Sequence, residues 1–374
     1  MGSLVSGQKD DGLGFAKSYS IKASGPGIKQ FDSNFIADKI LGIDENGNIT
    51  NSSTFASSMT MNEIIEYSQK IIRLIDVSGQ EKFKKSYLRG LNSLYPDYAL
   101  ILISAKEDFT IMSKEHLLFA ISLDIPLIFL ITKIDEVDNK QLEKAISNIQ
   151  ILINLASEKL IGKKIFIILK KEDLILYSEK MNELIPIILI NNKTLAGHDL
   201  LINLFNILPI KNIWKDYDKQ PPMFRVTRFI TTKSQKFITE GIMYRGEISI
   251  QKKYLIGPYE NGEYKVIEIA SIHCMHTSVK SVVSGQICSL EIIFMDKKKS
   301  VDHNLHKKKS GMVIVDLNSK IYSSFTFDVE MKCLGGDSKI PKKYQPIINI
   351  QNIRQAVKFI SIVDKDSGKI NQEK

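Results

Sequence analysis

The sequence has no long apolar run. Its longest apolar runs, such as IPLIFLI, span about seven residues, whereas a membrane helix needs about 20. The N-terminal stretch MGSLVSGQKDDG also lacks the apolar core and basic flank of a signal peptide. We therefore expect a soluble, cytoplasmic protein that makes no contact with membranes.

Cysteine is scarce, and Cys274, Cys288 and Cys333 are far apart in the sequence. Their spacing fits neither a metal site nor a disulfide framework, so we expect reduced thiols, as in cytosolic proteins. The tract from Ile272 to His276 holds two histidines and a cysteine. It falls in a predicted strand and at its edge, and we do not expect a metal there.

The sequence also lacks a glycine-rich loop ending in Gly-Lys-Ser/Thr, the usual cradle for nucleotide phosphates. Charge of one sign is not dominant either: 51 Lys and Arg stand against 42 Asp and Glu, a net charge of +9. That excess suits a partner with a phosphate backbone, and it equally suits a solvated basic surface. The same two interpretations apply to the lysine triplets 297–299 and 307–309, which are either a solvated loop or a contact to RNA phosphate.

The first half of the chain alternates short apolar runs with longer amphipathic stretches. The runs are continuously apolar, as in strands that are covered on both faces, and the stretches have apolar residues at three- and four-residue spacing. This alternation predicts an α/β unit with an open parallel sheet. The predicted strands are IIRLID (71–76), YALILIS (98–104), PLIFLIT (126–132), KIFIIL (164–169) and PIILIN (186–191).

The pattern changes near Lys219-Gln220-Pro221-Pro222. The strands that follow are short and bounded by turns, which predicts a small antiparallel β-barrel. A second β unit begins near Ser323, with three strands expected in FTFDVEMKCL, PIINI and AVKFISIVD. We expect an α/β domain over 1–212, a linker over 213–221, a β-barrel over 222–318 and a partial β-barrel over 319–374.

The stretch DVSGQEKF (76–83) directly follows the first predicted strand. Asp76 closes that strand, where a carboxylate can hold Mg²⁺. Gly79 has no Cβ, so its N–H can approach a γ-phosphate closely. Gln80 can orient an attacking water, as glutamine does in small GTPases. Alone, this motif is weak, because Asp76 can equally cap a turn.

The stretch TKID (132–135) begins at the last residue of the third predicted strand. The carboxylate of Asp135 can accept the N1–H and amino hydrogens of guanine, a pattern that adenine does not offer. Lys133 can lay its alkyl stem over the base, and Thr132 precedes it. The last strand leads into Asn191 and Asn192, where a backbone N–H can meet the guanine O6. The order and strand-end positions of these motifs together predict a guanine-nucleotide fold that binds GTP or GDP with Mg²⁺.

The sequence resembles the translational GTPases related to elongation factors Tu and one-alpha, in the branch that contains GTP-binding proteins 1 and 2. The resemblance covers nearly the whole chain. It is carried by DDGLGFAK (10–17), ILGIDENGN (40–48), LIDVSGQEKFKKSYLRGL (74–91), KEHLLFAISLDIPLIFLITKID (114–135), VVSGQICSLEI (282–292) and QNIRQAVKFISI (351–362).

The resemblance implies a P-loop-type G domain followed by two antiparallel β-barrels. It aligns GSLVSG with the helix after the phosphate loop, so Met1 falls inside that helix. We therefore expect a longer protein at both ends, with a missing central strand and phosphate loop ahead of residue 1. The first switch is altered: the family has a Gly-Arg-Thr-Ser-like element where this chain has Phe31-Asp32-Ser33-Asn34, in which Ser33 could offer a hydroxyl to Mg²⁺. The family's elongation factors carry His where this chain has Gln80.

Two functions fit these observations. The first is a GTPase that converts GTP to GDP and phosphate when the ribosome, with tRNA or mRNA, orders its switches, and that acts as a monomer. The second is a pseudo-GTPase that docks on RNA or the ribosome without turnover. The absent loop and the altered first switch favour the second; the strand-end motifs favour the first.

Overall fold

The structure is a computed structural model of the chain. It describes residues 3–4, 7–12, 36–50, 61–77, 81, 84–107, 109–156, 160, 162–210, 213–231, 236–259, 261–275, 277–295, 311–331, 344–351, 353–363 and 370–372. The chain divides into two compact units. The first contains Met1–Leu91 and Tyr95–Lys211, and the second contains Asn92–Leu94 and Asn212–Lys374.

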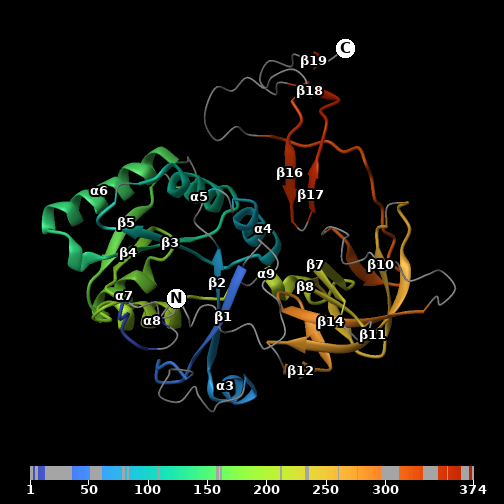
Figure 1. Cartoon of the computed structure of the whole chain (residues 1–374), viewed down its shortest axis with the longest axis horizontal. Helices are drawn as coiled ribbons and strands as arrows, with labels where there is room; N and C mark the ends of the chain where they lie inside the picture. The colour runs from blue at the N-terminus through green and yellow to red at the C-terminus, as the bar shows by residue number, and fades with distance from the viewer. Residues whose placement is uncertain are drawn as a thin grey trace. The chain divides into compact units, whose positions relative to one another are not determined.

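A four-stranded parallel sheet forms the centre of the first unit (Figure 1). Its strands, in spatial order, are β3 (Ala99–Ser104), β4 (Leu127–Thr132), β6 (Leu184–Leu189) and β5 (Lys164–Ile168). Helices connect them because parallel neighbours need a crossover. These are α5 (Ile111–Ser122), α6 (Asn139–Ala156) and α7 (Lys171–Glu179), and α8 (His198–Ile207) follows β6. The predicted α/β class is confirmed.

Both faces of β4, an inner strand of this sheet, are covered, which explains its continuously apolar sequence. On one face, Phe129 and Ile131 of β4 pack in a cluster with residues of α5 and α6. On the other, Ile128 and Leu130 pack with residues of α7 and α8. All five residues from Leu127 to Ile131 of β4 are at most 5% exposed. Strand β4 is therefore held rigidly up to the point where the TKID stretch begins.

The first predicted strand lies elsewhere. The run at 71–76 falls in β2 (Lys70–Val77), which pairs antiparallel with β1 (Ile36–Ile43) and places Ala37 opposite Asp76. Helix α3 (Met61–Tyr67) lies between them in the sequence. The expectation that 71–76 joins the parallel sheet is wrong for the described residues, in which no ladder links β2 to β3. The backbone groups of β2 pair with β1 instead. The central strand expected ahead of residue 1 stays a prediction.

A closed six-stranded antiparallel barrel forms most of the second unit, as predicted. Its order is β10-β15-β7-β8-β14-β11, and β11 pairs back with β10. The bounds are β7 (Met223–Thr231), β8 (Phe237–Arg245), β10 (Lys253–Gly257), β11 (Lys265–Cys274), β14 (Ile287–Phe294) and β15 (Val313–Asp316). The short strand β12 (Thr277–Val279) pairs with the end of β11, and β9 (Glu247–Ser249) pairs with β13 (Ser281–Val283) in a separate two-stranded sheet. Helix α9 (Ile213–Tyr217) precedes the barrel. Closure leaves the six barrel strands without a free edge.

Beyond the barrel, the described chain forms two hairpins. They are β16 (Ile347–Ile350) with β17 (Ile353–Ala356), and β18 (Ser361–Val363) with β19 (Ile370–Gln372). The strand expected in FTFDVEMKCL is absent from its described part, 325–331, where Phe325 is 95% exposed. An alternating pattern makes a strand only where a neighbour pairs with it, and none does here. Both lysine triplets lie outside the described residues.

No helix in the described part of the chain is long and apolar enough to cross a membrane.

Candidate functional site

Three strands of the parallel sheet end together. The backbone N–H of Ala105, after β3, donates to the carbonyl of Thr132 at 2.9 Å. The N–H of Ile190, after β6, donates to the carbonyl of Ile131 at 2.8 Å. The loops after β3, β4 and β6 therefore leave the sheet side by side at its carboxyl edge, where ligands bind in folds of this kind.

The loop after β4 turns sharply. Thr132 donates its hydroxyl to the carbonyl of Ile103 at 3.2 Å, which ties β4 to β3. Lys133 follows in the left-handed conformation, with φ 58° and ψ 35°, and the short 3₁₀ helix η2 covers Ile134–Glu136. A left-handed backbone is uncommon for a residue with a Cβ, and it makes a sharp turn here. This turn places Asp135 on η2, clear of the strand.

Asp135 meets the loop that follows β6. The ammonium of Lys193 lies 2.9 Å from Oδ2 of Asp135 and 3.3 Å from Oε1 of Glu136. The hydrogen bond from Lys193 lowers the pKa of Asp135 below its usual value. The pKa of Glu136 is lowered by Lys106 first, at 3.3 Å, and then by Lys193. Both carboxylates are therefore ionised at neutral pH.

The loop after β6 is held by its own side chains. Asn191 is buried, and its Oδ1 accepts hydrogen bonds from the backbone N–H of Lys193 at 2.8 Å and of Thr194 at 3.2 Å. Asn192 pairs through Oδ1 with Nε2 of His198 at 3.0 Å, and its carbonyl accepts from the N–H of Asp10 at 2.9 Å. Asn191 thus shapes the turn, while Asn192 is fastened at two points.

His198 is the buried first residue of α8. Burial lowers its pKa to about 4. The imidazole is therefore neutral at pH 7, and its Nε2 can carry the proton that Asn192 accepts. Sequence reasoning did not identify His198, because a lone histidine at a helix start carries no site signal.

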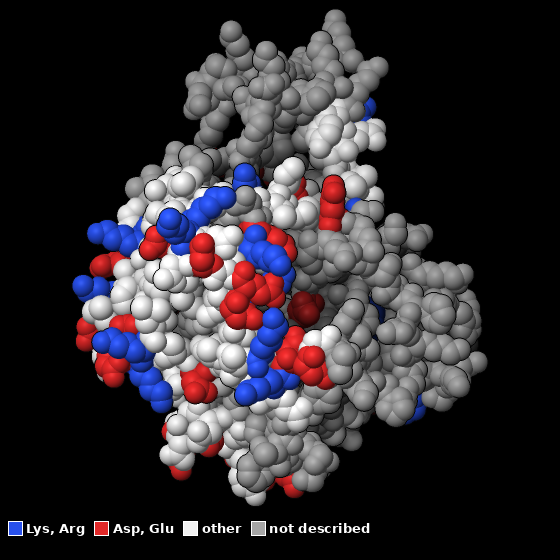
Figure 2. Space-filling model, turned by 60° about the vertical axis from the view of Figure 1, so that its left-hand side comes forward, with Lys and Arg blue, Asp and Glu red and all other residues white. Residues whose placement is uncertain are grey.

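Four further charged residues surround the predicted base-reading residues, and sequence reasoning missed them as site residues. Lys133 pairs with Glu107 at 3.2 Å; Lys106, Glu136 and Lys193 make the contacts described above. Glu136 directly follows Asp135 in the loop after β4. The loops after neighbouring parallel strands converge at one edge of the sheet, and this brings Lys106, Glu107 and Lys193 to the loop after β4. No local sequence pattern reports that convergence. Figure 2 shows acidic and basic side chains interspersed over the described part of the face that it draws.

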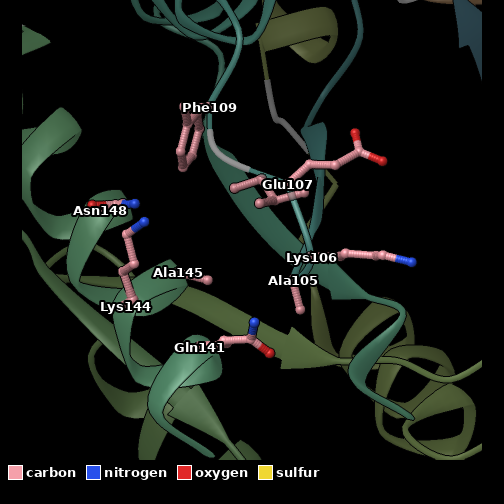
Figure 3. Close-up of a pocket in the computed structure, with 9 residues that line it drawn as sticks. Ala105, Lys106, Glu107, Phe109, Gln141, Lys144, Ala145 and Asn148 are labelled. Carbon is pink, nitrogen blue, oxygen red and sulfur yellow. The ribbon is translucent and has the colours of Figure 1, made fainter. Parts of the chain in front are cut away.

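A small cavity lies behind these loops, between the residues after β3 and helix α6 (Figure 3). Its volume is about 90 Å³, whereas pockets for nucleotide-sized ligands run to several hundred Å³. Figure 3 shows the charged ends of Lys106 and Glu107 pointing away from Lys144 and Asn148 of α6. The cavity is thus too small for a nucleotide, and Lys106 and Glu107 line it while their charged ends point away from its α6 side.

Of the residues predicted to hold the metal and the γ-phosphate, only Asp76 lies among the described residues. Asp76 lies near the end of β2, on the β1–β2 ladder and not on the parallel sheet. Its side chain keeps access to solvent, yet surrounding protein atoms desolvate the carboxylate and raise its pKa. A desolvated carboxylate gains from a nearby cation, so Asp76 fits a Mg²⁺ ligand. Ser33, Gly79 and Gln80 lie outside the described residues.

The tract from Ile272 to His276 offers no metal site in its described part. Among the described residues there is no group of three or more His, Cys, Asp or Glu side chains placed to hold a metal ion.

The sequence pattern of one protein family matches residues 39–278, well over half of the chain. That family is described as the elongation factor Tu GTP binding domain. The chain belongs to this family. It is thus a member of the translational GTPases, as the sequence resemblance implied, and a domain of this type implies binding of GTP or GDP.

The match to individual related proteins extends beyond that domain. GTP-binding protein 1 of Xenopus laevis is 26% identical over 365 residues, which cover 97% of this chain and 54% of the relative. GTP-binding protein 2 of Homo sapiens is 24% identical over 372 residues, which cover 98% and 59%. The chain therefore spans little more than half the length of these relatives.

A solved structure agrees on the fold. The bacterial selenocysteine-specific elongation factor EF-Sec superposes with a TM-score of 0.52 at 18% identity. The superposition covers 99% of this chain and 54% of that chain. At this identity the likeness bears on the fold, which is a G domain with a parallel sheet followed by a closed barrel.

Proposed function

We propose that this protein binds guanine nucleotides at the edge where β4 and β6 end, and that it hydrolyses GTP to GDP and phosphate. One observation carries the proposal: Lys193 and Asp135, from the two loops expected to read guanine, lie within 2.9 Å of each other. The two residues are separated by 58 positions in the sequence, so only the parallel sheet brings them together.

The base would lie between these loops. Asp135 would accept the N1–H and amino hydrogens of guanine with its two ionised oxygens. The backbone N–H of Asn192 would donate to O6, and the stem of Lys133 would cover the ring. Nucleotide entry would exchange the contact from Lys193 to Asp135 for hydrogen bonds from the base. Because adenine presents the reverse pattern at this edge, it would leave the carboxylate without its donors.

Hydrolysis is assigned to the segment after β2. Asp76, with a hydroxyl from Ser33, would hold Mg²⁺, which neutralises phosphate charge when it is bound. Gly79 would contact the γ-phosphate through its N–H. Gln80 would orient the water that attacks the γ-phosphorus as the bond to the GDP oxygen breaks. The support is the family membership and the strand-end position of Asp76.

We further propose that the protein acts as a cytoplasmic monomer with the ribosome, or with tRNA or mRNA. The support is indirect, since the related proteins include a selenocysteine-specific elongation factor from Haemophilus influenzae, 23% identical over 60% of this chain. On the described part of the face in Figure 2, charges of both signs alternate, so that area offers no broad basic surface for a phosphate backbone.

The test is a titration of the native, full-length protein with fluorescent GDP, using ADP as the matched control. We expect a Kd in the micromolar range or tighter for GDP and no saturable binding of ADP. If the folded protein binds neither, the nucleotide proposal fails, and docking on RNA or the ribosome without turnover becomes the better account.

A further inference from the structure

Two cysteines lie directly opposite each other in the barrel. The pairing of β11 with β14 places Cys274 across from Cys288, one step beyond the pair His273 and Ser289. Residues opposite each other in an antiparallel ladder project from the same face of the sheet. Cys288 is only 4% exposed in the barrel core, and Cys274 packs against that same core. Both carry thiols that are not joined in a disulfide.

The hydrogen-bond alternation of the ladder brings this pair close. On the other side of β14, Met243 donates to the carbonyl of Gln286, and Cys288 follows two residues later opposite Gly241. A residue in an antiparallel strand directs its N–H and C=O to one neighbour, and the direction alternates along the strand. The backbone of Cys288 thus points to β8, so Cys274 and Cys288 are a non-hydrogen-bonded pair on the β11 side.

Such a pair has the spacing that a disulfide needs. Cα atoms of non-hydrogen-bonded pairs are about 4.5 Å apart, and disulfides span Cα separations of about 4.4–6.8 Å. The thiol of Cys274 also donates to the carbonyl of Ile287, 3.5 Å away, which holds its sulfur beside the residue preceding Cys288. Gly241, on the other flank of Cys288, contributes no side chain.

The two thiols differ in access. Cys274 is the last residue of β11, is half-buried, and is followed by the turn at Met275. Cys288 is buried inside strand β14. An oxidant in solution can therefore reach Cys274 first. Cys288, directly opposite on β14, is close enough to attack the sulfur of Cys274 afterwards.

We propose that Cys274 and Cys288 form a reversible cross-strand disulfide site that reacts with low-molecular-weight disulfides such as glutathione disulfide. The Cys274 thiolate attacks one sulfur of glutathione disulfide and releases one glutathione. The Cys288 thiolate then attacks Sγ of Cys274 in the mixed disulfide and releases the second glutathione. Two protein thiols are oxidised and one glutathione disulfide is reduced, with the two protons passing to the two glutathione thiolates.

The test uses the full chain in buffers of fixed glutathione and glutathione disulfide concentration, quenched with acid, alkylated and digested with trypsin. Lys280 lies between the two cysteines, so cleavage separates peptide 266–280 from peptide 281–297. We expect mass spectrometry to find these two peptides joined by a disulfide in the folded protein. We also expect an equilibrium constant about tenfold or more higher than in concentrated urea, because folding aligns the sulfurs.

Single variants provide the matched controls. In Cys288→Ser, Cys274 should stop at the mixed disulfide with glutathione; in Cys274→Ser, Cys288 should remain a thiol. Cys333→Ser should leave the joined peptides unchanged. The proposal is overturned if the folded protein yields only mixed disulfides, if Cys333 replaces either partner, or if urea does not reduce the equilibrium constant. Circular dichroism of each variant verifies that the barrel is folded.

Discussion

The ammonium of Lys193 lies 2.9 Å from the carboxylate of Asp135, and the two residues come from different loops of the parallel sheet. Lys193 is largely exposed, so the pair adds little to the stability of the fold. Its importance is positional, because it shows that the loop after β6 reaches the residue expected to read the base. The contact also keeps Asp135 ionised, since it lowers the pKa of that carboxylate.

Asp135→Asn is expected to shift nucleotide preference from guanine to xanthine. The amide presents one donor and one acceptor in place of two acceptors, which suits the extra carbonyl of xanthine. We expect the affinity for GDP to fall by on the order of 100-fold and xanthosine diphosphate to become the better ligand. Competition of both nucleotides against fluorescent GDP measures the change. An unaltered preference for guanine would remove Asp135 from base recognition.

Lys193→Met is the matched control for that variant. It removes the ammonium and keeps a side chain of similar length, so Asp135 retains both acceptor oxygens. We expect GDP affinity to change by less than about tenfold, because an exposed ion pair contributes little. The preference for guanine over xanthine should persist. A switch to xanthine in this variant would show that specificity does not depend on the chemistry of Asp135.

Gln80→Leu is expected to spare nucleotide binding and slow hydrolysis. Leucine cannot hold the attacking water, and misplacing a reactant costs roughly 100-fold in rate. Single-turnover release of phosphate from GTP, measured beside the GDP titration, separates the two effects. An unchanged hydrolysis rate in a variant that still binds GTP would eliminate Gln80 from the mechanism.

Gly197→Ala should destabilise the loop after β6. Gly197 has φ +80°, and a Cβ there would clash with the carbonyl oxygen of Leu189. We expect the free energy of unfolding to drop by about 2–4 kcal/mol. Gly162→Ala is the control, because its φ is +89° but a Cβ would meet nothing within 4 Å. Strain alone should cost that variant about 1 kcal/mol.

Urea unfolding of both glycine variants compares them directly. Equal losses would mean that the close approach to Leu189 does not constrain the loop.

The buried imidazole of His198 should make stability depend on pH. Its pKa is about 4 in the folded chain and about 6.5 when exposed. Between these values the unfolded chain binds a proton that the folded chain does not. The free energy of unfolding should therefore fall as pH drops from about 6.5 to about 4, by about 3 kcal/mol in total. Above pH 6.5 this group makes no pH-dependent contribution.

His198→Gln isolates that effect from the carboxylates that titrate in the same range. Glutamine cannot be protonated here, and its amide can still donate to Asn192. Urea unfolding of both proteins at several pH values gives the difference between their stabilities. We expect the difference to be constant above pH 6.5 and to change in favour of the variant below it. A difference that is flat down to pH 4 would mean that His198 is not buried as a neutral base.

The fold class was predictable because hydrophobic burial leaves a direct trace in sequence. The runs at 98–104, 126–132, 164–169 and 186–191 are continuously apolar, and each became a parallel strand. The inner strands β4 and β6 are buried on both faces, whereas Leu102 of the edge strand β3 is 60% exposed. The barrel was predictable from short strands bounded by turns. The run at 71–76 looked the same, yet it pairs antiparallel with β1, because an apolar run does not specify its neighbour.

The predicted base-reading residues were identified from motif order at strand ends, since those strands end at one edge of a parallel sheet. Their immediate partners were not predictable. Glu107 and Lys193 carry no motif of their own, and their pairing with Lys133 and Asp135 depends on loop paths that have no sequence period. The strand expected in FTFDVEMKCL does not form over its described part, 325–331, for a related reason: a strand needs a pairing partner, and local sequence does not specify one.

The sequence by itself determined the α/β and barrel classes, the family resemblance, and the candidate residues at the strand ends. Local periodicity and residue chemistry suffice for these, because they depend on burial and on single side chains. The tertiary structure alone decided which loops meet, that His198 is buried and neutral, and that Cys274 faces Cys288. These are relations between residues distant in the chain, and they arise only when strand pairing fixes neighbours and register.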